Sequence, residues 1–102
     1  MKKSKNVYKI VLEIPKGKVM TYGQIGKTLG INPRQVGKTL HENPDPDNIP
    51  CHRVVNLQGE VADKYAFGGG EVQVHKLAQE GVGFVDGKVD LEKYIMPDKN
   101  LS

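Results

Sequence analysis

The chain is poor in cysteine, aromatic residues and long apolar runs. It has 102 residues with one Cys, no Trp and 6% aromatic residues. A single cysteine cannot form an internal disulfide, so a small disulfide-linked secreted scaffold is excluded, and Cys-rich zinc sites are excluded as well. No stretch approaches the roughly 18 apolar residues of a membrane span, and we expect no membrane partner. The first ten residues alternate polar and apolar side chains, which predicts a cytoplasmic protein without a secretory leader.

Positive charge is concentrated in the first part of the chain. Residues 1–41 contain nine Lys or Arg and one acidic residue, a net charge of +8, whereas residues 42–102 carry −5. A basic surface of this kind favours a polyanion such as nucleic acid as partner. A solvated lysine-rich face would have the same composition.

The basic part of the sequence predicts three helices. Apolar residues spaced at i, i+3, i+4 and i+7 predict an amphipathic helix over residues 4–14. A capping-box pattern at Thr21 begins a second helix, which ends at Gly30. Asn32 as N-cap and Pro33 at the first helical position begin a third.

The second and third helices are close enough in sequence to form a helix-turn-helix unit. Such a unit presents its second helix, here the third helix of the chain, to DNA. Val36 and Leu40 are expected on the buried side of this helix. Arg34 lies in its first turn, at the end that approaches the duplex. An ordinary helical hairpin in a small core has the same pattern, and the positive charge favours the DNA-binding interpretation.

The rest of the chain predicts short elements. A turn-rich loop at 43–48 leads to a strand at Val54–Val55, and Gly59 is expected to turn the chain into a second strand near Val61. A helix follows and ends at residues 80–81.

An Asp-Gly pair at 86–87 predicts a β-hairpin, and the tail at about 97–102 is expected to be disordered. The pattern as a whole predicts one domain spanning residues 1–102. Its fold class is mostly α with small β elements, a winged helix-turn-helix.

The single thiol, Cys51, is the main candidate for chemistry. A nucleophilic cysteine needs thiolate character, which nearby cations or an imidazole promote, and His52 and Arg53 follow it directly. A small buried hydrophobe is the alternative for a free cysteine. His41 and His75 complete no metal-ligand spacing with Cys51 and His52, so we predict no metal site.

Five short motifs occur in order over residues 5–91. They are T-Y-G-Q-I at 21–25, R-Q-V-G at 34–37, N-P at 43–44, I-P-C-H-R-V-V at 49–55 and E-G at 80–81. Together they resemble the 6-O-alkylguanine-DNA alkyltransferases, also called methylated-DNA–protein-cysteine methyltransferases. Several motifs in register are far more specific than one pentapeptide.

The resemblance implies a winged helix whose recognition helix enters the minor groove. Arg34 would fill the stack left by a flipped-out guanine, and Tyr22 would press on the phosphate of that nucleotide. Gly37 belongs to the same recognition-helix motif. Leu40 falls where the family has an apolar residue facing the groove.

The resemblance also implies the chemistry. Cys51 would take the alkyl group from guanine O6 and pass its proton through water to His52, which Glu80 would orient. The substrate pocket would be formed by Asn43, Pro50, Arg53, Val54 and Phe67.

The sequence departs from the family pattern at some positions. The usual G-Y-S-G-G stretch appears as Y-A-F-G-G at 65–69, and Gln73 stands where alkyltransferases commonly have lysine. The sequence begins almost directly at the expected DNA-binding helix, so we expect it to lack the additional N-terminal domain of many members, with its metal ligands. These departures resemble the alkyltransferase-like proteins, which bind alkylated guanine without repairing it. Those relatives typically lack the cysteine, whereas Cys51 is present here.

We therefore expect a suicide S-methyltransferase that reacts once, needs no cofactor and repairs alkylated guanine in double-stranded DNA. It would be monomeric, would associate with the nucleoid in a prokaryote, and could meet other repair proteins there. The main alternative is a damage sensor that binds the lesion without removing it. A winged-helix transcription regulator, which would prefer a DNA sequence to a lesion, is the third.

Overall fold

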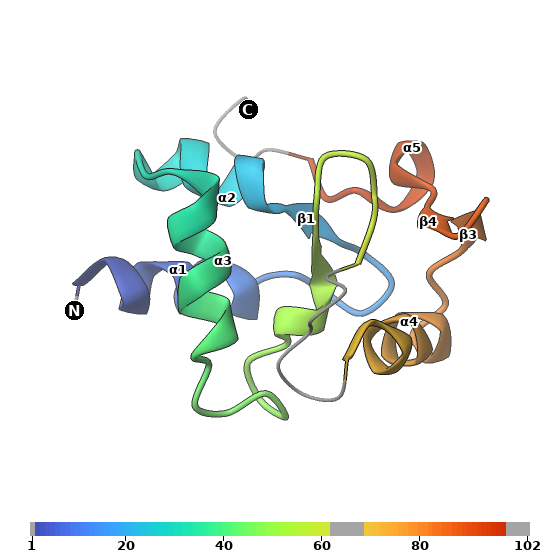
Figure 1. Ribbon diagram of the computed structural model, residues 1–102, viewed down its shortest axis with the longest axis horizontal. Coiled ribbons are helices and arrows are strands. Elements are labelled where there is room, and N and C mark those ends of the chain that lie inside the picture. The colour runs from blue at the N-terminus through green and yellow to red at the C-terminus, as the bar shows by residue number, and fades with distance from the viewer. Residues whose placement is uncertain (1, 62–68, 98–102) are drawn as a thin grey trace.

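The computed structural model describes residues 2–61 and 69–97, with side chains from residue 5 onward. Three helices of these ranges pack together at the N-terminal end of the molecule (Figure 1). Their bounds are Lys2–Leu12 for α1, Tyr22–Leu29 for α2 and Pro33–His41 for α3. All three were predicted. α1 ends two residues early, and the residues that follow continue it as a turn, in which the Ile14 N–H donates to the Val11 carbonyl.

Local capping fixes where α2 and α3 begin and end. The predicted capping box at α2 is confirmed, because the Thr21 hydroxyl accepts from the Gln24 N–H at 3.0 Å and the Gln24 side chain accepts from the Thr21 N–H at 2.9 Å. Asn32 caps α3 through an equivalent box, and Gly30 ends α2 with a φ of 70°. Gly26 allows the two helices to approach, since a Cβ there would lie 2.6 Å from a backbone carbonyl of the turn.

A short parallel pair of strands lies at the centre of the molecule. β1, Met20–Thr21, pairs in parallel with β2, Val54–Val55, so the predicted strand at 54–55 is confirmed. Val61, near which a second strand was predicted, lies in no strand, and residues 62–68 lie outside the described residues. The Asn56 side chain shapes the chain just before Val61. Its Oδ1 accepts from two later backbone N–H groups, including that of Glu60 at 2.8 Å, and this bends the chain into a tight loop.

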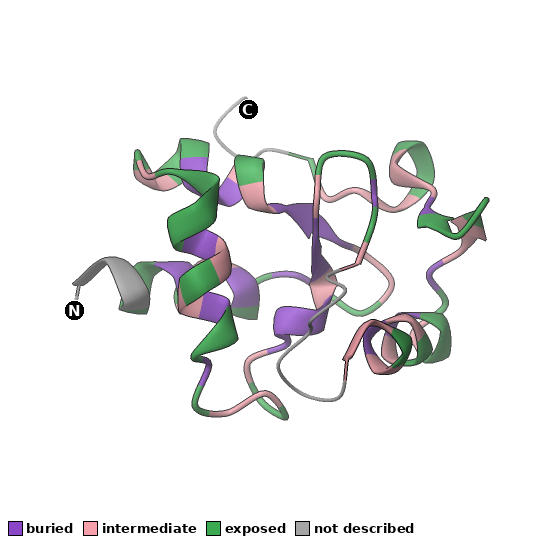
Figure 2. Cartoon of the chain, in the orientation of Figure 1, coloured by how far each residue is buried: buried purple, intermediate pink, exposed green. Residues whose placement is uncertain are grey.

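The strand pair separates two hydrophobic cores. Successive strand residues face opposite sides, so Val54 packs with the three helices while Val55 packs with the C-terminal elements. β1 behaves the same way, with Met20 in the first core and the preceding Val19 in the second. Figure 2 shows the buried residues gathered along these strands, between the exposed outer surfaces of the helices.

The C-terminal elements form the second layer and the wing. Their bounds are Gly69–Gln79 for α4, Phe84–Val85 for β3, Lys88–Val89 for β4 and Leu91–Tyr94 for α5. The hairpin is confirmed, with positive φ at Asp86 (54°) and Gly87 (78°) as a tight two-residue turn requires. α5 was not predicted. The end of α5 packs against the rest of the domain, where the Val19 N–H donates to the Tyr94 carbonyl at 2.9 Å.

The observed fold is thus a helix-turn-helix with small β elements, in agreement with the predicted class. Within the described ranges, no helix has the length and apolar character needed to cross a bilayer. Residues 98–102, most of the predicted tail, lie outside the described residues.

Candidate active site

Cys51 begins a single 3₁₀ turn, Cys51–Arg53, which is labelled η1 here and called the active turn below. The predicted strand at Val54–Val55 follows directly after this turn. Cys51 is 4% exposed and packs in the first core, and Pro50 before it is also buried. The Cys51 N–H donates to the Ile49 carbonyl at 2.7 Å, which closes the entry to the turn.

Asn43 shapes the loop that leads to the active turn. Its side chain is buried, and its Nδ2 donates to the Ile49 carbonyl at 2.9 Å. Its Oδ1 accepts from the Asp45 N–H at 2.9 Å. Both ends of the amide are therefore bonded within the loop, and Asn43 positions the chain just before Pro50.

Gln73 of α4 holds the active turn from the other side. Its Nε2 donates to the carbonyls of His52 and Val54, each at 3.0 Å, and the residue is 1% exposed. In the sequence, Gln73 stood out only as a departure from a family pattern. Its spacing was the available signal, since Gln73 precedes the buried Leu77 by one helical turn and therefore lies on the inward face of α4.

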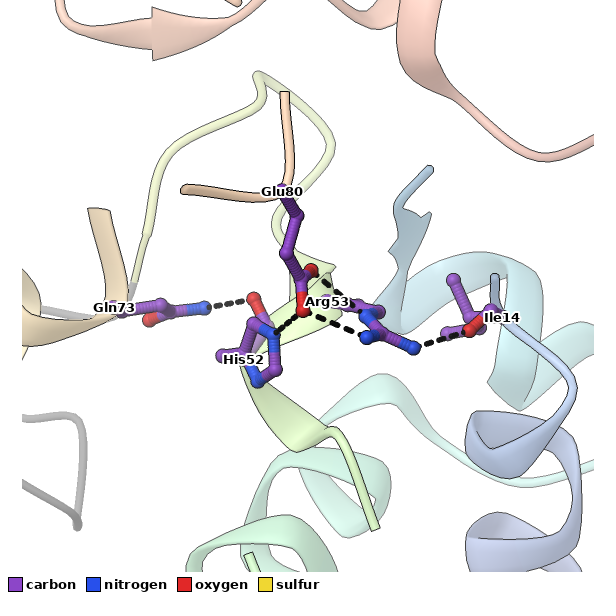
Figure 3. Close-up of polar contacts among 5 residues, drawn as sticks. All are labelled: Ile14, His52, Arg53, Gln73 and Glu80. Atoms are coloured by element: carbon purple, nitrogen blue, oxygen red, sulfur yellow. Dashed lines mark hydrogen bonds and ion pairs between the residues drawn. The ribbon is translucent and has the colours of Figure 1, made fainter. Parts of the chain in front are cut away.

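Glu80, immediately after α4, joins two residues of the active turn (Figure 3). Arg53 donates to it twice, from Nε to Oε1 at 2.9 Å and from Nη2 to Oε2 at 2.7 Å. The remaining Arg53 nitrogen, Nη1, donates to the Ile14 carbonyl at 2.7 Å. His52 Nε2 lies 3.0 Å from the same Oε2, so the His52–Glu80 pair expected from the resemblance is in contact.

His52 occupies a site that favours its neutral form. Burial lowers the pKa of its imidazole below the ordinary 6.5; contact with Glu80 raises it, and the charges of Arg53 and Lys76 lower it further. Both ring nitrogens are buried, and neither makes a hydrogen bond of good geometry. The 3.0 Å approach to Glu80 is therefore an electrostatic contact with a poor N–H direction. A neutral imidazole with a free lone pair can accept a proton.

Glu80 remains ionised in the folded protein. Burial alone would raise the pKa of its carboxyl, but the hydrogen bonds from Arg53 and the contact with His52 outweigh burial and leave the pKa below the ordinary 4.5.

The expected DNA-contacting residues of the helix-turn-helix differ in their exposure to solvent. Arg34 is exposed in the first turn of α3. Tyr22 is half-buried, and burial, with a smaller effect of Cys51, raises the pKa of its hydroxyl. A Cβ at Gly37 would lie 3.9 Å from the Tyr22 ring, so α3 packs closely over that tyrosine. Leu40 is 5% exposed in the first core, which confirms its predicted place on the buried side of α3 and corrects the expectation that it faces the groove.

Two of the expected pocket residues have their side chains engaged within the protein. Val54 is fully buried in the first core, and the Arg53 guanidinium is bonded through three nitrogens. The pocket itself stays a prediction. Phe67 lies outside the described residues. In the described part of the chain, no cluster of three or more His, Cys, Asp or Glu side chains could hold a metal ion.

Comparison with known proteins gives a consistent result. Residues 2–82 match the family model for 6-O-methylguanine DNA methyltransferase, DNA binding domain. A DNA base-flipping protein of Vibrio parahaemolyticus is 39% identical over 93 residues, which cover 86% of this chain and 89% of that protein. The crystal structure of Schizosaccharomyces pombe Atl1 in complex with damaged DNA containing O6-carboxymethylguanine superimposes with a TM-score of 0.83. It has 32% identity and covers 94% of this chain and 95% of that one.

One relative named as a methyltransferase matches over a shorter stretch of this chain. The methylated-DNA–protein-cysteine methyltransferase of Saccharolobus islandicus (strain L.S.2.15) is 54% identical over 54 residues. The matched stretch covers 53% of this chain and only 36% of that relative.

Proposed function

The chain belongs to the 6-O-methylguanine DNA methyltransferase family, and from that premise we propose that it moves an alkyl group from guanine O6 in duplex DNA to its own Cys51. The observation that carries the proposal is that Cys51 and a buried His52, whose site favours the neutral form, are consecutive residues of one turn, with His52 in contact with an ionised Glu80. A nucleophilic thiol needs such a base, and the base needs a partner that fixes its orientation.

The proposed reaction is a single displacement. The Cys51 proton moves to the imidazole of His52, and the thiolate sulfur attacks the alkyl carbon. A C–S bond forms as the bond between that carbon and O6 breaks. The guanine leaves with the electron pair and takes up one proton, so the thiol and the alkylguanine become a thioether and guanine. Nothing restores the thiol, and each molecule reacts once.

His52 Nδ1 is the nitrogen best suited to take the proton. Nε2 faces the Glu80 carboxylate at 3.0 Å, where an N–H is favourable and a bare lone pair is not. We assign the N–H to Nε2 on this contact, which leaves Nδ1 as the acceptor, buried and without a hydrogen-bond partner.

The helix-turn-helix would deliver the substrate. A base within a duplex is out of reach of a buried thiol, so the target guanine must leave the stack. Exposed Arg34 at the start of α3 could occupy the vacated space, and the basic first part of the chain would bind phosphates. The S. pombe structure, which has a similar fold and is in complex with damaged DNA, supports damaged DNA as the partner.

A damage sensor is the second candidate. It is favoured by the match to the base-flipping protein, which extends over nearly the whole of that protein. In this case the protein would bind the lesion and leave the alkyl group on guanine.

Intact-protein mass spectrometry after incubation with a duplex containing one 6-O-methylguanine tests the proposal. We expect one added CH2 unit per protein molecule, mapped to Cys51, and no addition to Cys51→Ala. Binding of Cys51→Ala to the same duplex should persist. A wild-type protein that stays unmodified while binding the lesion duplex more tightly than plain DNA would establish the sensor instead.

A free alkylguanine base separates extrusion from chemistry. Arg34→Ala should slow transfer from the duplex and leave transfer from the free base unchanged, because a free base needs no extrusion. Lys88→Ala, which removes an exposed cation outside the basic first part of the chain, is the matched control. Equal rates for Arg34→Ala and wild type on the duplex would contradict the role of Arg34.

A further inference from the structure

Arg53 is bonded more completely than a pocket-lining residue would be. Two of its nitrogens donate to the two oxygens of Glu80 at 2.9 and 2.7 Å, and Nη1 donates to the Ile14 carbonyl at 2.7 Å. The side chains of Arg53 and Glu80 are 12% and 14% exposed. A two-bond arginine–carboxylate pair away from bulk water is a strong, geometrically fixed interaction.

His52 contacts a carboxylate that is already in use. The oxygen 3.0 Å from His52 Nε2 is Oε2, which also accepts the 2.7 Å bond from Arg53. The charged groups that act on His52 are Glu80, Arg53 and Lys76, with Cys51 adjacent on the turn. Two cations and burial oppose a third positive charge there, and one shared anion favours it.

We propose that Arg53 is a positioning residue which holds Glu80 in a two-bond pair and thereby keeps His52 neutral, with Nδ1 open to take the Cys51 proton. Without the guanidinium, Glu80 would be free to pair fully with the imidazole and stabilise its cation. A cationic His52 cannot accept a proton. The inference rests on the proposed function for its catalytic meaning, and it deepens that proposal.

A purely structural role for Arg53 makes a different prediction. If Arg53 only joined the end of α1 to the active turn, its loss would lower stability and leave the protonation of a folded His52 unchanged. The protonation equilibrium of His52 therefore separates the two roles.

The experiment is an NMR titration of the histidine ring protons in the full chain without DNA. The proteins are wild type, Arg53→Met, Arg53→Lys and the control Lys88→Met, which removes an exposed cation on the hairpin. The chain has three histidines, and the signal missing from His52→Gln identifies His52. Thermal melts show which variants are folded.

We expect Arg53→Met to raise the proton affinity of His52 about tenfold, a shift of about one pH unit in the titration midpoint. Arg53→Lys keeps the charge and loses the two-bond geometry, so its midpoint should rise by less. Lys88→Met should match wild type. An unchanged or lowered midpoint in folded Arg53→Met overturns the proposal. If that variant does not fold, an unchanged midpoint in Arg53→Lys overturns it.

The rate of methyl transfer, measured against pH, keeps the two proposals distinct. If Arg53 acts as proposed, transfer by the folded variant falls at low pH and recovers at higher pH, following the His52 midpoint. A wild-type protein that transfers no methyl group refutes the proposed function, and the titration still decides whether Arg53 controls His52.

Discussion

The helix-turn-helix and the active turn are held in place by contacts of very different range. The caps of α2 and α3 join residues no more than three positions apart. The active turn depends on hydrogen bonds that join residues 19 to 39 positions apart. Gln73 donates to carbonyls at the turn, and Arg53 of the turn donates to Glu80 and to the Ile14 carbonyl. A substitution in the first region should therefore have a local effect, while one in the second should loosen the reactive turn and both cores that it joins.

Glu80→Gln should have the largest effect on stability. It leaves the Arg53 guanidinium without its anion in a site that is largely closed to water, and we expect a loss of about 3 kcal/mol in unfolding free energy. Urea denaturation measures it. Glu92→Gln, on the exposed side of α5, is the matched control and should be close to neutral. Equal stability of the two variants would contradict a structural role for the long-range pair.

Gln73→Leu should have the next largest effect. The substitution keeps a similar volume but removes the donor for two buried carbonyls, at a cost of about 2 kcal/mol. Gln79→Leu tests the same change at an exposed position of α4. If both variants unfold at the same urea concentration, the bonds from Gln73 contribute nothing to the turn.

Thr21→Ala tests the locally stabilised region. It removes the side-chain half of the capping box, and we expect about 1 kcal/mol of destabilisation. Thr28→Ala, exposed on the same helix, should change stability by less than about 0.5 kcal/mol. Hydrogen exchange should show the Thr21→Ala effect in α2 and little change at the active turn. A comparable change at the turn would show that the two regions are not independent.

Acidification tests the long-range contacts of the active turn without a substitution, and it should lower the stability of the protein gradually. The pKa of His52 lies below 6.5 in the folded state, so the unfolded chain binds this proton more readily and stability falls as pH drops below about 6.5. The lowered pKa of Glu80 adds a further loss below about pH 4.5. Unfolding free energies across this range measure both, and Glu80→Gln should lack the second loss. Stability that rises on acidification would contradict both directions.

Prediction from sequence succeeded where short-range rules apply. The Thr21 and Asn32 caps and the Asp86–Gly87 hairpin were all identified from neighbouring residues, and the structure confirms them. It failed where a distant segment decides the outcome. Val61 itself lies in no strand, and the partner that β2 has in the described residues is β1, more than thirty residues earlier in the chain.

The candidate site divides in the same way. Motifs identified Cys51, His52 and Glu80 by type and order, and the structure brings His52 and Glu80 into contact. The sequence could not indicate that all three nitrogens of the Arg53 guanidinium are bonded, since their partners lie 27 and 39 positions away. Leu40 was expected both on the buried side of α3 and facing the DNA groove, and packing placed it in the first core.

By itself, the sequence determined α1 to α4, the caps of α2 and α3, the hairpin and the identity of the thiol, because each depends on residues that are neighbours along the chain. Only the tertiary structure decided that Gln73 holds the active turn and that Arg53 and His52 share the Glu80 carboxylate. Burial and hydrogen-bond direction govern these contacts, and both are properties of segments that meet only when the chain is folded.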